Sequence, residues 1–153
     1  MSTEINRRKF IKKAVAGIVT AQLGYLVYDA LKNTTSELTD EELFLAGKVD
    51  FFEKGKLYPF NSGNFYLSVL EDGGMLALSV KCTHLGCVIR VKEEGFECPC
   101  HASAFDKYGE VLSPPATRAL DIFPIRIVKG EILVDITQAI KRKSFDKSQL
   151  TYA

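Results

Sequence analysis

The feature that most constrains this chain is the stretch 82–105, which holds all four of its cysteines and both of its histidines. Residues 82–87 read Cys-Thr-His-Leu-Gly-Cys, and residues 98–105 read Cys-Pro-Cys-His-Ala-Ser-Ala-Phe. Thiolate and imidazole side chains are the ligands of zinc and of iron–sulfur centres. Because the chain uses neither residue type elsewhere, we interpret this stretch as a metal site and not as packing material.

The spacing of these residues leaves three hypotheses open. Cys82 and His84 form a Cys-x-His pair, and after thirteen intervening residues Cys98 and His101 form a Cys-x-x-His pair. Two cysteines and two histidines match a structural zinc site in number, but two further cysteines are then unexplained. The same four match a two-iron, two-sulfur (2Fe-2S) centre in which two histidines replace two cysteines on one iron. Two disulfides are disfavoured, because the cysteines that flank a single proline would crowd both bridges into one turn.

The two boxes, Cys-Thr-His-Leu-Gly-Cys and Cys-Pro-Cys-His-x-Ser, resemble the paired signature of Rieske iron–sulfur proteins. The form with two extra cysteines is similar to the Rieske subunits of quinol-oxidising cytochrome bc-type complexes. The resemblance covers residues 75–135 and implies a mainly β structure. We therefore expect a small antiparallel Rieske-type β fold with an inserted cluster-binding subdomain at residues 81–118, preceded by one N-terminal transmembrane helix.

The resemblance also implies a role for each cysteine and histidine. The implied ligands of a Rieske-type 2Fe-2S cluster are Cys82 and Cys98 on the inner iron and His84 and His101 on the outer iron. The implied disulfide joins Cys87 to Cys100 and holds the two ligand loops together. A bridge that closes a loop of about fourteen residues stabilises a fold by on the order of 3 kcal/mol in the chain-entropy model.

Four neighbouring positions match residues that surround the cluster in the family. Leu85 matches an apolar cover, Ser103 matches a serine that donates to a bridging sulfide, and Pro114 matches a proline-rich loop beside the cluster. Phe105 stands where the family often has a tyrosine that donates to a ligand sulfur. Hydrogen bonds to the sulfurs help to set the reduction potential. We therefore expect a potential below that of tyrosine-containing relatives, which fits a low-potential donor such as menaquinol.

The N-terminus carries a second informative pattern. Residues 6–12, Asn-Arg-Arg-Lys-Phe-Ile-Lys, are similar to a twin-arginine export signal, and residues 14–28 carry no charge. Cleavage after Ala21 would leave an apolar core at the short limit for a signal peptide, so retention as a membrane anchor is favoured over cleavage. The basic residues before the apolar segment predict a cytoplasmic N-terminus. The domain on the far side then lies on the periplasmic or outer face of a bacterial inner membrane.

The remaining patterns divide the chain into three parts. We expect the signal and anchor in residues 1–31, a flexible linker in 32–40 and the Rieske domain in 41–153. A capping-box pattern at Thr39–Glu42 predicts a short helix that runs to Ala46 and ends at Gly47. Alternating and β-branched residues predict the strands 49–52, 57–60, 65–70, 75–80, 88–91, 122–128 and 131–136. The tail 137–153 fits either a solvated extension or a contact with partner subunits.

The function that we infer from the resemblance is electron transfer within a quinol–cytochrome c oxidoreductase-type complex. The implied partners are a quinol, cytochrome b-type and cytochrome c-type subunits and the membrane, with His84 and His101 as the groups that meet the quinol. The net charge of +1 argues against nucleic acid as a partner. The first alternative is the Rieske small subunit of another exported oxidoreductase, such as an arsenite-oxidase-type enzyme. The second is a zinc-binding interaction domain.

Overall fold

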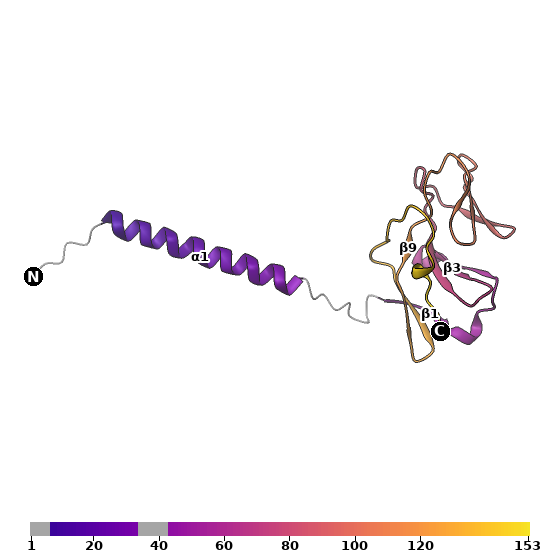
Figure 1. Cartoon of the computed structure of the whole chain (residues 1–153), viewed down its shortest axis with the longest axis horizontal. Coiled ribbons are helices and arrows are strands. Elements are labelled where there is room, and N and C mark those ends of the chain that lie inside the picture. Colours follow the sequence, from indigo (N-terminus) through magenta and orange to yellow (C-terminus); the bar gives the residue numbers. More distant parts are fainter. Residues whose placement is uncertain (1–6, 34–42) are drawn as a thin grey trace, which may run out of the picture. The chain divides into compact units, whose positions relative to one another are not determined.

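The computed structural model describes residues 7–33 and 43–153, which separate into a helical unit and a β domain (Figure 1). The helix α1 spans Arg7–Asn33 and extends two residues into the predicted linker. The rest of that linker, and the capping pattern at 39–42, lie outside the described residues. Within α1, Arg7–Asp29 is long and apolar enough to cross a membrane, with a mean hydropathy of 1.3 over its most apolar window.

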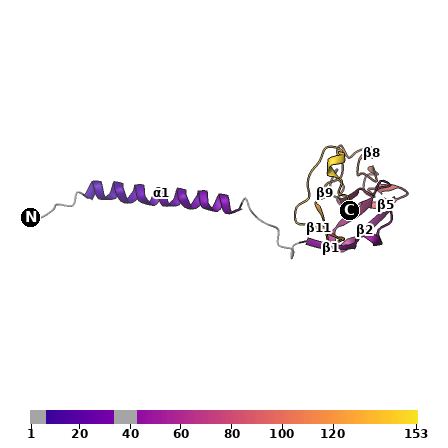
Figure 2. The same cartoon turned by 60° about the horizontal axis from the view of Figure 1, so that its bottom comes forward.

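The β domain consists of three antiparallel sheets, as the mainly β prediction requires (Figure 2). The first sheet has the strand order β1 (Leu43–Lys48), β11 (Glu131–Asp135), β10 (Ile125–Val128). The second has the order β2 (Leu57–Phe60), β3 (Phe65–Val69), β4 (Met75–Ser79), β9 (Ile122–Phe123). The third has the order β5 (Arg90–Lys92), β6 (Gly95–Glu97), β7 (Ala104–Asp106), β8 (Val111–Ser113). Three 3-10 turns complete the described structure: η2 (Val49–Phe51), η3 (Asn61–Gly63) and η4 (Lys147–Gln149).

The second sheet is the middle layer, because its two central strands send alternate side chains into two different cores. Phe65 and Leu67 of β3 enter the core shared with the first sheet, whereas Tyr66 enters the core shared with the third sheet. In β4, Ala77 likewise enters the core shared with the first sheet and Leu78 enters the core shared with the third sheet. Successive residues of a strand point to opposite faces, so every residue of β3 and β4 is buried. The third sheet and its loops lie at one end of the domain (Figure 1).

The predicted short helix to Ala46 is wrong, because residues 43–48 form the strand β1. Phe44 pairs with Val134, and Lys48 pairs with Glu131. Gly47 adopts a φ of 138° beside a break in the strand register, so it accommodates a bulge and does not end a helix. Pairing with β11, whose residues lie 83 to 92 positions away in the chain, overrides the local helix pattern.

Two strand predictions also need correction. Residues 49–51 form the turn η2, since the Val49 N–H donates to the Gly130 carbonyl and the Phe52 N–H donates back to Val49. The expected strand at 122–128 is divided at Pro124 into β9 and β10, which belong to different sheets. Proline has no N–H to offer a sheet, and the chain changes layers at this point.

The C-terminal tail packs against the domain. Met75 and Thr151 exchange backbone hydrogen bonds of 2.9 and 3.1 Å, and Ile122 and Ile140 exchange a second pair. Arg142 is buried, with 6% of its surface exposed. The sequence did not predict where this tail lies. In the structure it is hydrogen-bonded to β4 and β9 of the middle sheet and to the segment that follows the cysteine loops.

Candidate metal centre

Two short loops carry the cysteines and histidines, and both are closed by the same pair of backbone hydrogen bonds. In the first loop, Cys82 N–H donates to the Cys87 carbonyl and Gly86 N–H donates to the Cys82 carbonyl, both over 2.8 Å. In the second loop, the Cys98 N–H donates to the Ser103 carbonyl and the Ala102 N–H donates to the Cys98 carbonyl. Gly86 and Ala102 therefore hold equivalent places, with positive φ angles of 78° and 58°. The fold thus presents two loops of the same design side by side.

The two cysteines that begin these loops are unbridged thiols in the interior. Cys82 and Cys98 are 3% and 2% exposed. Burial raises the pKa of the Cys82 thiol, a backbone hydrogen bond at His84 opposes the rise, and the neighbouring Cys98 sulfur adds to it. Two adjacent thiols without a nearby cation resist ionisation, whereas a bound metal ion replaces their protons and makes thiolates favourable. The pair is therefore suited to a metal.

The two histidines also lie against each other. Their ring centroids are 5.0 Å apart, and the ring planes meet at 85°. The Nδ1 atom of His84 is buried and has no hydrogen-bond partner within the described part of the chain. A buried polar atom without a partner is rare, because burying it costs about 1–3 kcal/mol. A metal ion would satisfy this nitrogen, which is the behaviour expected of a ligand.

The remaining two cysteines, Cys87 and Cys100, form a disulfide with Cα atoms 6.6 Å apart. Their sulfurs and that of Cys98 lie within 4.8 Å of one another, which is itself a spacing that a metal could use. The disulfide excludes that grouping, because bridged sulfurs are not thiolates and only thiolates bind metals strongly. The free donors that remain are the thiols of Cys82 and Cys98 and the imidazoles of His84 and His101.

The four other residues singled out from the sequence surround these loops in two different ways. Leu85 is 70% exposed and Pro114 is also exposed, so both belong to the outer surface. Ser103 and Phe105 are fully buried. Phe105 lies in the same apolar core as Cys82 and Cys98, and a hydrogen bond from the Ser103 side chain acts on the Cys82 thiol.

A model of the Rieske [2Fe-2S] domain matches residues 42–124 of this chain. The chain belongs to the Rieske [2Fe-2S] domain family. The match covers more than half of the chain (83 of 153 residues) and includes both ligand loops. The cofactor of this Rieske chain is accordingly a 2Fe-2S cluster, and the zinc-site hypothesis is disfavoured.

Individual proteins resemble this chain to different extents. The cytochrome b6-f complex iron-sulfur subunit of Chlorobaculum tepidum is 28% identical over 140 residues, which cover 87% of this chain and 77% of that protein. The plasma membrane Rieske protein PetC3 from Synechocystis PCC 6803 is 30% identical, with a TM-score of 0.48 over 60% of this chain and 97% of that one. The quaternary ammonium Rieske monooxygenase CntA shares the fold, with a TM-score of 0.54 at 11% identity over 63% of this chain and 33% of its own.

The donor set fits the cofactor. Two buried adjacent thiols, two adjacent imidazoles and an unpartnered Nδ1 atom are the groups that a cluster with two cysteine and two histidine ligands requires. The Ser103 hydroxyl oxygen accepts a 3.0 Å hydrogen bond from the Ala116 N–H. That oxygen is thus held in place while its own proton stays free to donate toward sulfur.

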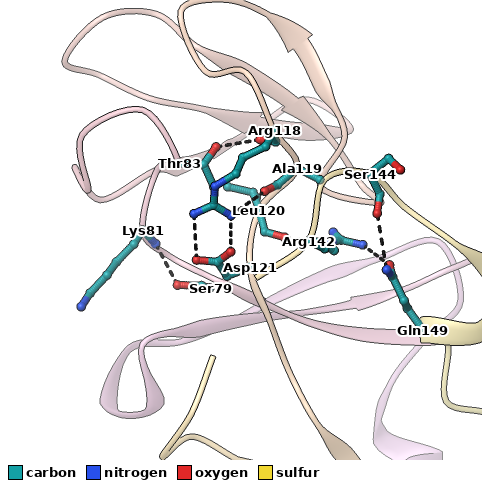
Figure 3. A network of polar contacts seen from close by, with 10 residues as sticks. All are labelled: Ser79, Lys81, Thr83, Arg118, Ala119, Leu120, Asp121, Arg142, Ser144 and Gln149. Atoms are coloured by element: carbon teal, nitrogen blue, oxygen red, sulfur yellow. Dashed lines mark hydrogen bonds and ion pairs between the residues drawn. The ribbon is translucent and has the colours of Figure 1, made fainter. Parts of the chain in front are cut away.

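The structure also shows polar contacts around the ligand loops that the sequence did not indicate. The Thr83 hydroxyl donates to the Arg118 carbonyl over 2.7 Å, and the Arg118 side chain pairs with Asp121 (Figure 3). The buried side chain of Arg142 donates to the Leu120 carbonyl nearby. Thr83 stands inside the first box, which is a weak signal. For the Arg118 carbonyl and for Arg142 the sequence offers none, because their partners lie 35 and 22 positions away.

Proposed function

We propose that this Rieske chain is the membrane-anchored electron-transfer subunit of a quinol-oxidising complex of the cytochrome b6-f or bc type. The similarity to the Chlorobaculum tepidum subunit supports the proposal, because it extends over 87% of the chain and so well beyond the Rieske domain itself. The helix α1 supports it as well, since a subunit that serves a lipid-soluble donor needs a place at the membrane.

The observation that carries the proposal is the difference in exposure between the two kinds of donor residue. The thiols of Cys82 and Cys98 are 3% and 2% exposed, whereas the His101 side chain is exposed at the surface. When bound, the 2Fe-2S cluster supplies a one-electron acceptor and donor. A reaction partner can approach this site along the histidine side, while the apolar core keeps water from the cysteine side.

The histidines would then handle the proton of the quinol. We propose Cys82, Cys98, His84 and His101 as the cluster ligands. The Nδ1 atom of His84 is buried without a partner among the described residues, so we propose that it binds the cluster and that Nε2 is the nitrogen left for a quinol. Once it has lost its own proton, this nitrogen of a metal-bound imidazole could accept the hydrogen bond of a quinol hydroxyl and take up that proton. Exposed Leu85 in the first ligand loop and exposed Pro114 offer apolar surface that a quinol ring or a cytochrome b-type subunit would contact.

The donor and acceptor belong to the same proposal. Phe105 lacks the hydroxyl that would raise the reduction potential, which supports a low-potential quinol such as menaquinol as donor and a cytochrome c-type subunit as acceptor. The five basic residues in the first two turns of α1 support a cytoplasmic N-terminus and a Rieske domain on the periplasmic or outer face. They also continue the twin-arginine-like pattern, which we propose acts as the export signal.

Purification from membranes in mild detergent tests the function. We expect equal amounts of iron and acid-labile sulfide in the chain, together with co-purifying b-type and c-type haem subunits. Zinc in place of iron would overturn the proposal. A molybdenum-containing partner without haem subunits would redirect it to an arsenite-oxidase-type enzyme.

Substitution of the proposed ligands tests the site. Cys82→Ser and His101→Ala should abolish the visible absorption of the cluster, because each removes one of four ligands. Cys87→Ser should speed the loss of the cluster without removing a ligand. A cluster that is intact in His101→Ala would contradict the proposed ligand set.

A further inference from the structure

Residues 116–121, here called the brace segment, join parts of the domain that are distant in sequence. Almost every peptide group along the segment is hydrogen-bonded to a different element. The described contacts are Ala116 N–H to Ser103 Oγ, Thr83 Oγ1–H to the Arg118 carbonyl, Ala119 N–H to the Lys143 carbonyl, Leu120 N–H to the Gly109 carbonyl, and Ser79 N–H to the Asp121 carbonyl. The brace segment is thereby tied to both ligand loops, to the end of β4 and to the C-terminal tail.

The contact with the first ligand loop is the one nearest to the proposed ligands. Thr83 lies between Cys82 and His84, and its hydroxyl donates to the Arg118 carbonyl over 2.7 Å. A side chain fixed at this position restrains the peptide groups on both sides of it. The direction of the Cys82 sulfur and of the His84 ring thus depends on where the brace segment places the Arg118 carbonyl.

The Arg118 side chain determines that place by closing a turn within the brace segment. Its guanidinium contacts both carboxylate oxygens of Asp121, with Nη2 3.3 Å from Oδ2, and its Nη1 also lies 3.5 Å from the Ala119 carbonyl (Figure 3). The two side chains are 31% and 16% exposed, so solvent screens this pair only in part. A two-pronged arginine–carboxylate contact fixes geometry as well as charge.

The domain also offers a matched ion pair for comparison. Lys92 and Glu97 pair on the cluster-binding subdomain, across strands β5 and β6, with side chains 61% and 35% exposed. This pair makes no contact with a ligand loop among the interactions of the described residues. Exposed pairs of this kind contribute little to stability.

We propose that Arg118 and Asp121 are positioning residues for the 2Fe-2S cluster, which hold the Arg118 carbonyl where it fixes Thr83 between two ligands. The inference rests on the proposed ligand set. It assigns the ion pair a role in the geometry of the metal site, beyond the stability of the fold.

The test uses the full chain, purified in detergent with its cluster, and the variants Arg118→Gln, Thr83→Val and their combination. We expect Arg118→Gln to speed cluster loss, followed by visible absorbance, by about two- to tenfold, which corresponds to the loss of one hydrogen bond. Its visible circular dichroism, which reports ligand geometry, should change. The double variant should resemble Thr83→Val alone, because both substitutions disable the same contact. Thr83→Ser keeps the hydroxyl and should restore wild-type behaviour.

The control variant is Lys92→Gln, in the ion pair that makes no described contact with a ligand loop. Lys92→Gln should leave both readouts unchanged; cluster loss equal to that of Arg118→Gln would overturn the inference. If Arg118→Gln does not fold, Asp121→Asn replaces it with the same expected result. Unchanged circular dichroism together with a lowered unfolding temperature would mean a merely structural role and would also overturn the inference.

The ligand variant Cys82→Ser separates this inference from the proposed ligand set. If Cys82→Ser loses the cluster while Arg118→Gln behaves as wild type, the inference alone fails. A cluster retained in Cys82→Ser refutes the ligand set and the inference together.

Discussion

Gly86 and Ala102 show how one backbone requirement is met by two different residues. Both precede the last residue of a ligand loop, and both have a left-handed conformation, with φ of 78° and 58°. Glycine adopts this conformation without strain, whereas a residue with a Cβ pays roughly 1–2 kcal/mol. The two loops have the same hydrogen bonds, so the residue type at this place should affect stability through the backbone alone.

We therefore predict opposite effects at these two positions. Ala102→Gly should stabilise the domain by about 0.5–1 kcal/mol, since the released strain exceeds the extra chain entropy of glycine in the unfolded state. Gly86→Ala should destabilise it by about 1 kcal/mol although nothing lies within 4 Å of the added Cβ. Denaturant unfolding of the apo-protein measures both. A destabilised Ala102→Gly variant would show that the Ala102 methyl group has a packing role.

Phe105 gives a prediction about the reduction potential. Its ring is fully buried in the core that includes both free cysteines. Phe105→Tyr should raise the potential by on the order of 40 mV, the one-electron equivalent of a hydrogen bond of about 1 kcal/mol to a ligand sulfur. Voltammetry measures it, and Phe105→Leu is the control that changes packing without adding a donor. A reduction potential that stays the same or falls in the tyrosine variant would refute the prediction that a hydroxyl at this position donates to a ligand sulfur.

At the scale of elements, the C-terminal tail is held against the domain by hydrogen bonds that sequence periodicity does not predict. The Arg142 side chain donates to the Leu120 carbonyl over 2.6 Å and to the Gln149 side chain over 2.7 Å, and it also contacts the Tyr108 carbonyl. Burial lowers the pKa of this guanidinium, while the carboxylates of Glu110, Asp106 and Asp121 oppose the shift. One cation thus connects the tail, the brace segment and the loop after β7.

We predict that Arg142→Met destabilises the domain by about 2–4 kcal/mol, because two backbone carbonyls lose their donor inside the protein. The neighbouring Lys141 is exposed, so Lys141→Met should change stability by less than about 0.5 kcal/mol. Denaturant unfolding of both variants gives the comparison. Equal stability of the two variants would mean that the buried guanidinium contributes nothing net.

At the scale of the whole molecule, the chain combines an apolar helix with a β domain that has its own cores. Exposed apolar side chains run along α1, including Ile18, Leu23 and Leu26. In water such a surface is unfavourable at about 25 cal/mol for each Å². A lipid environment would remove this cost, which is consistent with the proposed membrane anchor.

The prediction at this scale concerns membrane attachment. The chain should stay with the membrane in high salt and require detergent for release. Ile18→Lys, near the middle of the candidate span, should weaken insertion by about 3 kcal/mol and shift the chain to the soluble fraction. Val128→Lys, at an exposed apolar position of the β domain, is the control and should not change the distribution. Release of the wild-type chain by salt alone would contradict the anchor.

The sequence by itself determined the metal chemistry, the β class of the domain and the apolar helix. These follow from local patterns: ligand residues within twenty positions, alternation along strands and an uncharged run. Only the tertiary structure decided that residues 43–48 form a strand, that Pro124 divides a strand between two sheets, that the Thr83 hydroxyl meets the Arg118 carbonyl, and that Arg142 donates to Leu120. The physical reason is that most of these outcomes depend on partners far away in the sequence, such as Asp135 for Leu43 and Arg118 for Thr83, and the free energy of such long-range contacts exceeds the local preferences that a sequence displays.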